Sequence, residues 1–232
     1  MALTGLPPAA DKRAHVRAMF DRIAPRYDRM NRLLSLGLDQ RWRRVAIAAI
    51  GVGPGDVVLD LACGTGDLTE LARERGARAI GADFAREMLR EAVRRGVDAE
   101  LVAADCAALP FPDGFATAVT CGFALRNFDS LAEILAEAQR VLARGGRIAL
   151  LEVDRPKGAI ARAGHSLYFD QLVPRIGALL ADRAAYSYLP RSTQYLPPPP
   201  ALLELIRHNG FEDVKHRSLL LGAVQLLTGV RR

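Results

Sequence analysis

The sequence predicts an α/β domain built on a mainly parallel sheet with helices on both faces. The main observation is that short β-rich runs alternate with amphipathic helical patterns from residue 57 to residue 153. A glycine-containing loop follows the first of these runs, as expected where a parallel strand leads to a ligand site. The composition, 50% hydrophobic and 25% charged, allows a packed core of this kind.

Helical patterns precede this alternation and occupy residues 1–50. Residues 1–11 are expected to form a loose tail. Apolar residues recur at helical spacing over 16–27, where Pro25 is expected to break or kink the helix. A second helix is expected around 42–50 and ends at a glycine. We interpret residues 1–50 as a tail and a helical lid.

The alternation itself predicts five strands with helices between them. The strands are expected at 57–61, 78–82, 99–103, 115–121 and 147–153. The clearest amphipathic helix spans 131–142, and Gly145 and Gly146 are expected to turn the chain from it into the fifth strand. Because parallel strands share one carboxyl edge, ligand-binding side chains are expected there. Residues 51–232 are interpreted as one domain.

An insertion is expected within this domain at 157–200, where a segment rich in Tyr, Pro and Arg interrupts the alternation. Beyond it, a helix is expected at 201–209. Two closely spaced strand-like runs, 211–217 and 223–230, are expected to pair as an antiparallel hairpin.

The net charge of +6 has three interpretations. Most basic residues are arginines that lie beside acidic ones along predicted helices, which favours solvated helix faces. An anionic membrane surface, met by Arg41, Arg43 and Arg44, is a second hypothesis. Nucleic acid is the least favoured, because no basic face is concentrated enough.

The sequence also predicts a cytoplasmic chain, because it has neither a secretory signal pattern nor an apolar run of about 20 residues. Peripheral contact with the inner face of the membrane is compatible with this. The three cysteines lack metal-ligand spacing, so neither a metal site nor a disulfide framework is expected. A monomer and a homo-oligomer are both compatible with the sequence.

The loop after the first strand carries the strongest local signal. Gly64 and Gly66 let the backbone approach a ligand at a helix start. A dinucleotide-binding loop would have a third glycine where this chain has Thr69. Asp60 and Asp67 would repel a diphosphate, but they are compatible with a ligand that carries an amino group and a sulfonium.

Acidic residues also end the second and third strands. Asp83, followed by Phe84, lies where a carboxylate could accept bonds from both ribose hydroxyls, and Asp105 lies at the expected adenine edge beside Cys106. Asp60 or Asp83 alone could be a helix cap. Acidic residues at three successive strand ends instead predict an adenosyl ligand.

The segments LDLACGTG, GADF, AADCAALPFPDGF and LARGGRIALLE resemble class I S-adenosylmethionine-dependent methyltransferases. Residues 20–28 with 31–35, residues 125–127 and residues 185–190 narrow the resemblance to the ubiquinone/menaquinone biosynthesis C-methyltransferase family. The similarity extends from about residue 15 to the C-terminus. It implies a Rossmann-like sheet, an N-terminal helical lid and S-adenosylmethionine as cofactor.

By matching position, the resemblance implies cofactor contacts at Thr65, Asp83, Asp105 and Cys106. The family usually has a serine where this chain has Gly122, so only a backbone contact is expected there. The complete set of candidate cofactor-binding residues is Asp60, Gly64, Thr65, Gly66, Asp83, Phe84, Asp105, Cys106 and Gly122.

The implied reaction is C-methylation of a polyprenylated quinol, with demethylmenaquinol in menaquinone biosynthesis as the favoured substrate. The candidate catalytic residues are Arg126, Asn127, Tyr186 and Tyr27. Arg126 could stabilise a phenolate or serve as a structural ion-pair partner, and Asn127 could orient a quinol hydroxyl. Both tyrosines could instead pack a lid. The residues do not identify a general base.

Other functions stay open at this point. The acceptor could be a benzoquinol of the ubiquinone pathway or a small phenol, or the chain could be a non-catalytic scaffold that binds S-adenosylmethionine. A base-amino methyltransferase is disfavoured because residues 123–127 lack the Asn/Asp-Pro-Pro-aromatic motif.

Overall fold

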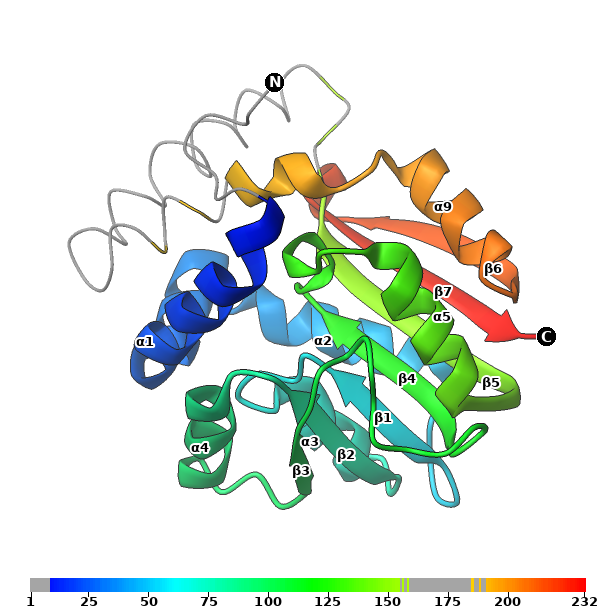
Figure 1. Ribbon diagram of the computed structural model, residues 1–232, viewed down its shortest axis with the longest axis horizontal. Helices are drawn as coiled ribbons and strands as arrows, with labels where there is room; N and C mark the ends of the chain where they lie inside the picture. Colours follow the sequence, from blue (N-terminus) through cyan, green and yellow to red (C-terminus); the bar gives the residue numbers. More distant parts are fainter. Residues whose placement is uncertain (1–8, 155, 157, 159–184, 186–187, 189–190) are drawn as a thin grey trace.

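The computed structural model describes residues 9–154, 156, 158, 185, 188 and 191–232 (Figure 1). Tyr186 and most of the predicted insertion lie outside the described residues.

A seven-stranded sheet forms the centre of the described chain, in the order β3-β2-β1-β4-β5-β7-β6 (Figure 1). Its strands are β1 (Val57–Leu61), β2 (Arg78–Asp83), β3 (Glu100–Ala103), β4 (Ala116–Gly122), β5 (Leu142–Val153), β6 (Phe211–Leu219) and β7 (Val224–Arg231). The first five strands pair in parallel, whereas β7 is antiparallel to both β5 and β6. The predicted mainly parallel sheet with a C-terminal antiparallel hairpin is confirmed.

Helices cover both faces of this sheet, as predicted. The described α-helices are α1 (Ala9–Ser35), α2 (Leu38–Ile50), α3 (Asp67–Glu74), α4 (Arg86–Arg94), α5 (Leu131–Val141) and α9 (Pro199–His208). Side chains of β1 alternate between the faces. Val58 packs with α2 and α3, whereas Leu59 packs on the opposite face with α5 and α9. Ile47 of α2 is fully buried in the first of these clusters, so α2 belongs to the packing of the sheet.

The α1 helix differs from the prediction at two points. It begins at Ala9, so residues 9–11 do not belong to a tail, and it continues through Pro25 without a break. A proline inside a helix removes one backbone hydrogen bond. Ile23 and Met30 on either side of Pro25 are buried against the rest of the chain, and this packing outweighs the local cost.

The β5 strand also begins earlier than predicted, at Leu142, so Gly145 and Gly146 lie inside it. Ala116 of β4 pairs with Leu142, but Ala118 pairs with Arg147, so the β5 residues between them leave the regular register. Gly145 has a φ of +74° in this irregular segment. Residues 143–146 therefore lie opposite the single residue Thr117, and regular pairing of β5 starts at Arg147, where the strand was predicted to begin.

The strand order reverses between β1 and β4, which is where open α/β sheets bind ligands at their carboxyl ends. In Figure 1, α1 lies beside the carboxyl ends of the parallel strands. Among the described helices, none is long and apolar enough to cross a membrane.

Candidate active site

Three small adjoining cavities follow the carboxyl ends of β1, β2 and β4. The first, of about 60 Å³, is lined by Gly64, Asp83, Phe84 and Gly122 among others. A second, of about 80 Å³, is lined by Phe84, Asp105 and Cys106. A third, of about 20 Å³, is lined by Asp60, Gly64, Thr65 and Gly122. The three cavities share lining residues, and we call them together the crescent. Every predicted cofactor-binding residue except Gly66 lines the crescent.

Asp83 connects the glycine loop to the helix that follows β2. One carboxylate oxygen accepts a hydrogen bond from the Gly64 N–H at 2.8 Å, and the other accepts one from the Ala85 N–H at 2.8 Å. Asp83 is not the helix cap that the sequence allowed, because the N-cap residue of α4 is Ala85. Its carboxylate instead holds the segment before the helix and lines the crescent. Burial raises the pKa of Asp83 to about 6.

Asp60 is held beneath the loop rather than pointing freely into the crescent. Its two oxygens accept hydrogen bonds from the hydroxyls of Thr69 at 2.8 Å and Thr120 at 2.7 Å. These bonds connect β1 to α3 and β4, so Asp60 positions the loop. Burial raises its pKa to about 6. A contact between Asp60 and the cofactor stays a prediction.

The α1 helix lies across the crescent and contacts three of its edges. Asp28 accepts a hydrogen bond from the Thr65 hydroxyl at 2.6 Å. Asp21 accepts one from the Glu87 N–H at the start of α4, and Arg13 pairs with Asp105. These contacts are spaced along one helix over the ends of β1, β2 and β3, as a lid would be.

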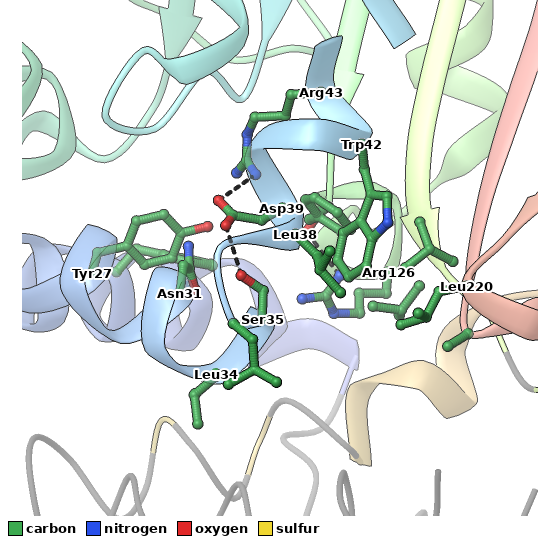
Figure 2. A pocket seen from close by; sticks show the side chains of 16 residues that line it. Tyr27, Asn31, Leu34, Ser35, Leu38, Asp39, Trp42, Arg43, Arg126 and Leu220 are labelled. Atoms are coloured by element: carbon green, nitrogen blue, oxygen red, sulfur yellow. Dashed lines mark hydrogen bonds and ion pairs between the residues drawn. The ribbon is translucent and has the colours of Figure 1, made fainter. Parts of the chain in front are cut away.

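A larger apolar cavity of about 360 Å³ adjoins the crescent (Figure 2). It lies between α1, α2 and the turn from β6 to β7. Its walls include Tyr27, Leu34, Trp42, Phe123 and Leu220. Tyr27 and Phe123 also line the 60 Å³ cavity, so molecules in the two spaces would meet at these residues.

Arg126 lies at the inner end of this apolar cavity and pairs with Glu152 at the end of β5. Both side chains are buried, with 6% and 0% of their surface exposed. The guanidinium also donates to the Phe123 carbonyl at 2.8 Å and to the Ser192 hydroxyl at 3.2 Å. Arg126 is therefore an ion-pair partner, as one of the two interpretations expected, and it is also a lining residue of the apolar cavity.

Tyr27 lines both the crescent and the apolar cavity, whereas Asn127 lines the crescent alone. Asn127 lines both larger cavities of the crescent and accepts a hydrogen bond from the Tyr188 hydroxyl at 3.3 Å. Burial raises the pKa of Tyr188 to about 12, so this hydroxyl stays a donor. Tyr27 packs edge-on against Phe20, and burial raises its pKa as well.

A sequence profile of the ubiE/COQ5 methyltransferase family matches residues 9–231. The chain belongs to this family. The demethylmenaquinone methyltransferase of Roseiflexus sp. (strain RS-1) is 42% identical over the full length of both chains. That of Thermus thermophilus is 44% identical over 92% of this chain and 100% of its own. The ubiquinone/menaquinone biosynthesis C-methyltransferase of Desulfotalea psychrophila is 41% identical over 93% of this chain and 90% of its own. The predicted family is confirmed.

Solved structures confirm the predicted fold class. The magnesium protoporphyrin IX methyltransferase of Synechocystis has a TM-score of 0.64 at 20% identity, covering 96% of this chain and 100% of that one. An S-adenosylmethionine-dependent methyltransferase of Thermotoga maritima has a TM-score of 0.66 at 17% identity, and the match covers 93% of this chain and 99% of that one. The sheet of this chain is therefore that of class I methyltransferases.

The crescent fits the S-adenosylmethionine that this methyltransferase family implies. Gly64 and Gly66 have φ values of +58° and +85°, and a Cβ on Gly64 would come within 3.3 Å of the Met88 side chain. Both φ values lie in the left-handed region, which favours glycine at these two positions of the loop. The 60 Å³ cavity has the Asp83 carboxylate and no basic lining residue, which suits a ribose better than a phosphate.

We expect cofactor affinity to fall as the pH is lowered, because the Asp83 carboxylate must be ionised to accept both ribose hydroxyls. With a pKa of about 6 before binding, Asp83 is mostly protonated at about pH 5 and ionised at about pH 7.5. Calorimetry with S-adenosylhomocysteine should show affinity about tenfold lower at the lower pH. Asp60→Asn removes the other carboxyl with a pKa of about 6 and should preserve this dependence. If Asp60→Asn abolished the pH dependence of cofactor affinity, that dependence would be due to Asp60 and not to Asp83.

Gly122→Ser, which introduces the serine that the sequence resemblance implies at this position, should tighten cofactor binding by a few-fold. A Cβ there would lie 2.8 Å from Cδ1 of the buried Leu68, so the end of that side chain must shift. A hydroxyl at this edge of the crescent would add about one hydrogen bond, worth roughly 0.5–1.5 kcal/mol. Titration of Gly122→Ser against Gly122→Ala separates the hydroxyl from the added methyl group, and equal affinities would refute the assignment.

Two residues that position the site were not singled out from the sequence. Glu152 ends the apolar run of β5, and an acidic residue at the carboxyl end of a buried strand was an available signal. Arg95 follows α4 and pairs with Asp28 at 2.9 Å and with Asp67 at 2.7 Å. No local pattern marks Arg95, because its partners are far away in the sequence.

Proposed function

We propose that this chain transfers a methyl group from S-adenosylmethionine to a ring carbon of demethylmenaquinol, producing menaquinol in menaquinone biosynthesis. Relatives with the name demethylmenaquinone methyltransferase, 42% and 44% identical over nearly the whole chain, support this substrate most strongly. The apolar cavity supports it independently, because a fused aromatic ring with a prenyl tail needs an apolar site beside the methyl donor.

Arg126 and Asn127 have the chemistry to activate such a ring. S-Adenosylmethionine supplies an electrophilic methyl group, so the acceptor carbon must be electron-rich, as it is in a quinol that has lost a phenolic proton. The buried guanidinium of Arg126 would stabilise that negative charge at the cavity wall. The Asn127 amide would hydrogen-bond a ring hydroxyl and hold the carbon in line with the donor.

The two candidate tyrosines have positioning roles in this proposal. Tyr27 lines the apolar cavity and two cavities of the crescent, so its ring would pack against both ligands. Its pKa is raised by burial, which makes it a poor base near neutral pH. Tyr186 lies outside the described residues, and its role stays a prediction.

A benzoquinol is the second candidate acceptor, because a relative at 41% identity has both ubiquinone and menaquinone biosynthesis in its name. The test incubates the protein with S-adenosylmethionine labelled in the methyl group and either demethylmenaquinol or the demethylated benzoquinol, with and without reductant. We expect reductant-dependent transfer to demethylmenaquinol. Transfer to the benzoquinol alone would reassign the acceptor. Cofactor binding without transfer to either would favour a scaffold.

We also propose that the chain works as a peripheral protein at the inner face of the membrane, because a polyprenylated quinol resides in the bilayer. The hypothesis that three arginines of α2 meet an anionic membrane surface is wrong for one of them. Arg43 cannot meet anionic lipid, since it is buried and pairs with Asp39 at 3.0 Å and Asp67 at 3.5 Å. Arg41 and Arg44 are exposed on the same helix and stay candidates for contact with anionic lipid.

A further inference from the structure

Four exposed leucines lie in the two chain segments, 33–36 and 220–221, that contribute lining residues to the apolar cavity, and we call them the leucine rim. Leu33 and Leu36, at the end of α1, are 47% and 78% exposed. Leu220 and Leu221, in the turn between β6 and β7, are 49% and 85% exposed. Among the described residues, the other large hydrophobic side chain with comparable exposure is Val93 of α4. Exposed apolar side chains are therefore concentrated on one part of the surface.

The turn between α1 and α2 and the turn between β6 and β7 both line the apolar cavity. Leu36 and Leu220 are among its lining residues, so the rim continues directly into the apolar interior (Figure 2). Figure 2 shows Leu34 and Leu38 from the α1–α2 region and Leu220 from the opposite turn around this space. A tail that leaves the cavity between these turns would pass along the rim.

The backbone holds three of these leucines in an unfavourable conformation. Leu36, Leu220 and Leu221 have φ values of +53°, +44° and +53°. Glycine or asparagine adopts this region at lower cost, so leucine is a poor choice for the turn itself. Strained positions that persist are concentrated at functional sites, and here the strain directs apolar side chains into the solvent.

The charges of the two segments that carry the rim are almost all positive, and the acidic residue beside the β6–β7 turn is Asp154, whose N–H donates to the Ala223 carbonyl. Exposed basic residues near the two turns are Arg29, Arg41, Arg44, Lys215 and Arg217. Segment 214–226 contains no acidic residue, and segment 29–44 contains only Asp39, which is buried and paired. An apolar tip within a basic surface is the pattern that binds anionic lipid bilayers.

We propose that the leucine rim inserts into the interfacial region of an anionic bilayer, so that the apolar cavity opens toward the acyl chains. This inference rests on the proposed function. The flanking arginines would contact anionic headgroups, and the prenyl tail would stay in the bilayer while the quinol ring enters the cavity. Arg41 and Arg44 thus act with the rim rather than as an independent basic patch.

The test compares two variants by flotation with phosphatidylglycerol-containing vesicles. Leu33→Gln with Leu221→Asn removes two rim side chains that do not line the cavity, and both replacements suit their backbone. Val93→Gln is the matched control, because Val93 is 65% exposed on α4, which does not line the cavity. We expect the rim variant to lose at least about tenfold in vesicle partitioning, and the control to bind like the unaltered protein.

A second readout separates this inference from the proposed function. The rim variant should methylate a short-tailed, water-dispersed quinol normally and lose activity only toward a long-tailed quinol in vesicles. Flotation needs no turnover, so it tests the rim even if the acceptor is wrong. Equal binding by both variants, or binding independent of phosphatidylglycerol, would overturn the proposal. A dimer of the unaltered protein that dissociates in the rim variant, without vesicle binding, would assign the rim to a second copy of this chain.

Discussion

Arg126→Met should lower the free energy of unfolding by about 3–5 kcal/mol, because it leaves Glu152 buried without its partner. The guanidinium also supports the Phe123 carbonyl and the Ser192 hydroxyl, and both contacts are lost. Methyl transfer should fall by more than about 100-fold, as expected when a group that stabilises developing charge is removed. Chemical denaturation and single-turnover assays measure the two effects separately.

The double variant Arg126→Met with Glu152→Gln distinguishes the structural role of Arg126 from its chemical role. Glutamine removes the buried charge, and its carbonyl oxygen can still accept from the Val153 N–H that Glu152 now binds at 2.8 Å. Most of the lost stability should return. Methyl transfer should stay low if Arg126 acts on the quinol. Recovery of both stability and turnover would show that Arg126 only holds β5 and the loop after β4 together.

Asp83→Asn should weaken S-adenosylhomocysteine binding by about 10- to 100-fold, the value expected for the loss of charge-assisted hydrogen bonds. Both carboxylate oxygens accept from backbone N–H groups, so an amide nitrogen at either position would face a donor. The substitution therefore disturbs the glycine loop as well as the ribose contacts. Calorimetry at neutral pH measures the loss.

Asp98→Asn is the matched control for this experiment. Asp98 is 87% exposed in the loop after α4, where it pairs with Arg73 at 3.6 Å. The same change of charge and size at this position should leave affinity unaltered. If both variants bind equally well, Asp83 serves only to hold the backbone at Gly64 and Ala85, and the ribose must be held elsewhere.

Most of the sheet could be predicted because its signals are local. Val57–Leu61 is a short apolar run before a glycine loop, and the run at β4 has the same character. The acidic strand ends Asp83 and Asp105 lie together because parallel strands share one carboxyl edge, a consequence of topology alone.

The parts that sequence reasoning missed depend on distant contacts. Continuation of α1 through Pro25 depends on packing against residues such as Tyr188, about 160 positions away. Burial of Arg43 depends on Asp67 of α3 and on the ring of Phe123, 5.1 Å away. A run of arginines on a helix is usually solvent-exposed, so nothing near Arg43 in the sequence indicates that it is buried.

The attachment site of the methyl group tests the central claim most directly. The protein is supplied with S-adenosylmethionine carrying a ¹³C-methyl group and with reduced demethylmenaquinone, and the lipid product is examined by NMR. We predict a methyl carbon bonded to the ring, with loss of the proton that the methylated ring carbon carried. A methoxy carbon with the ring proton retained would show O-methylation and contradict the account.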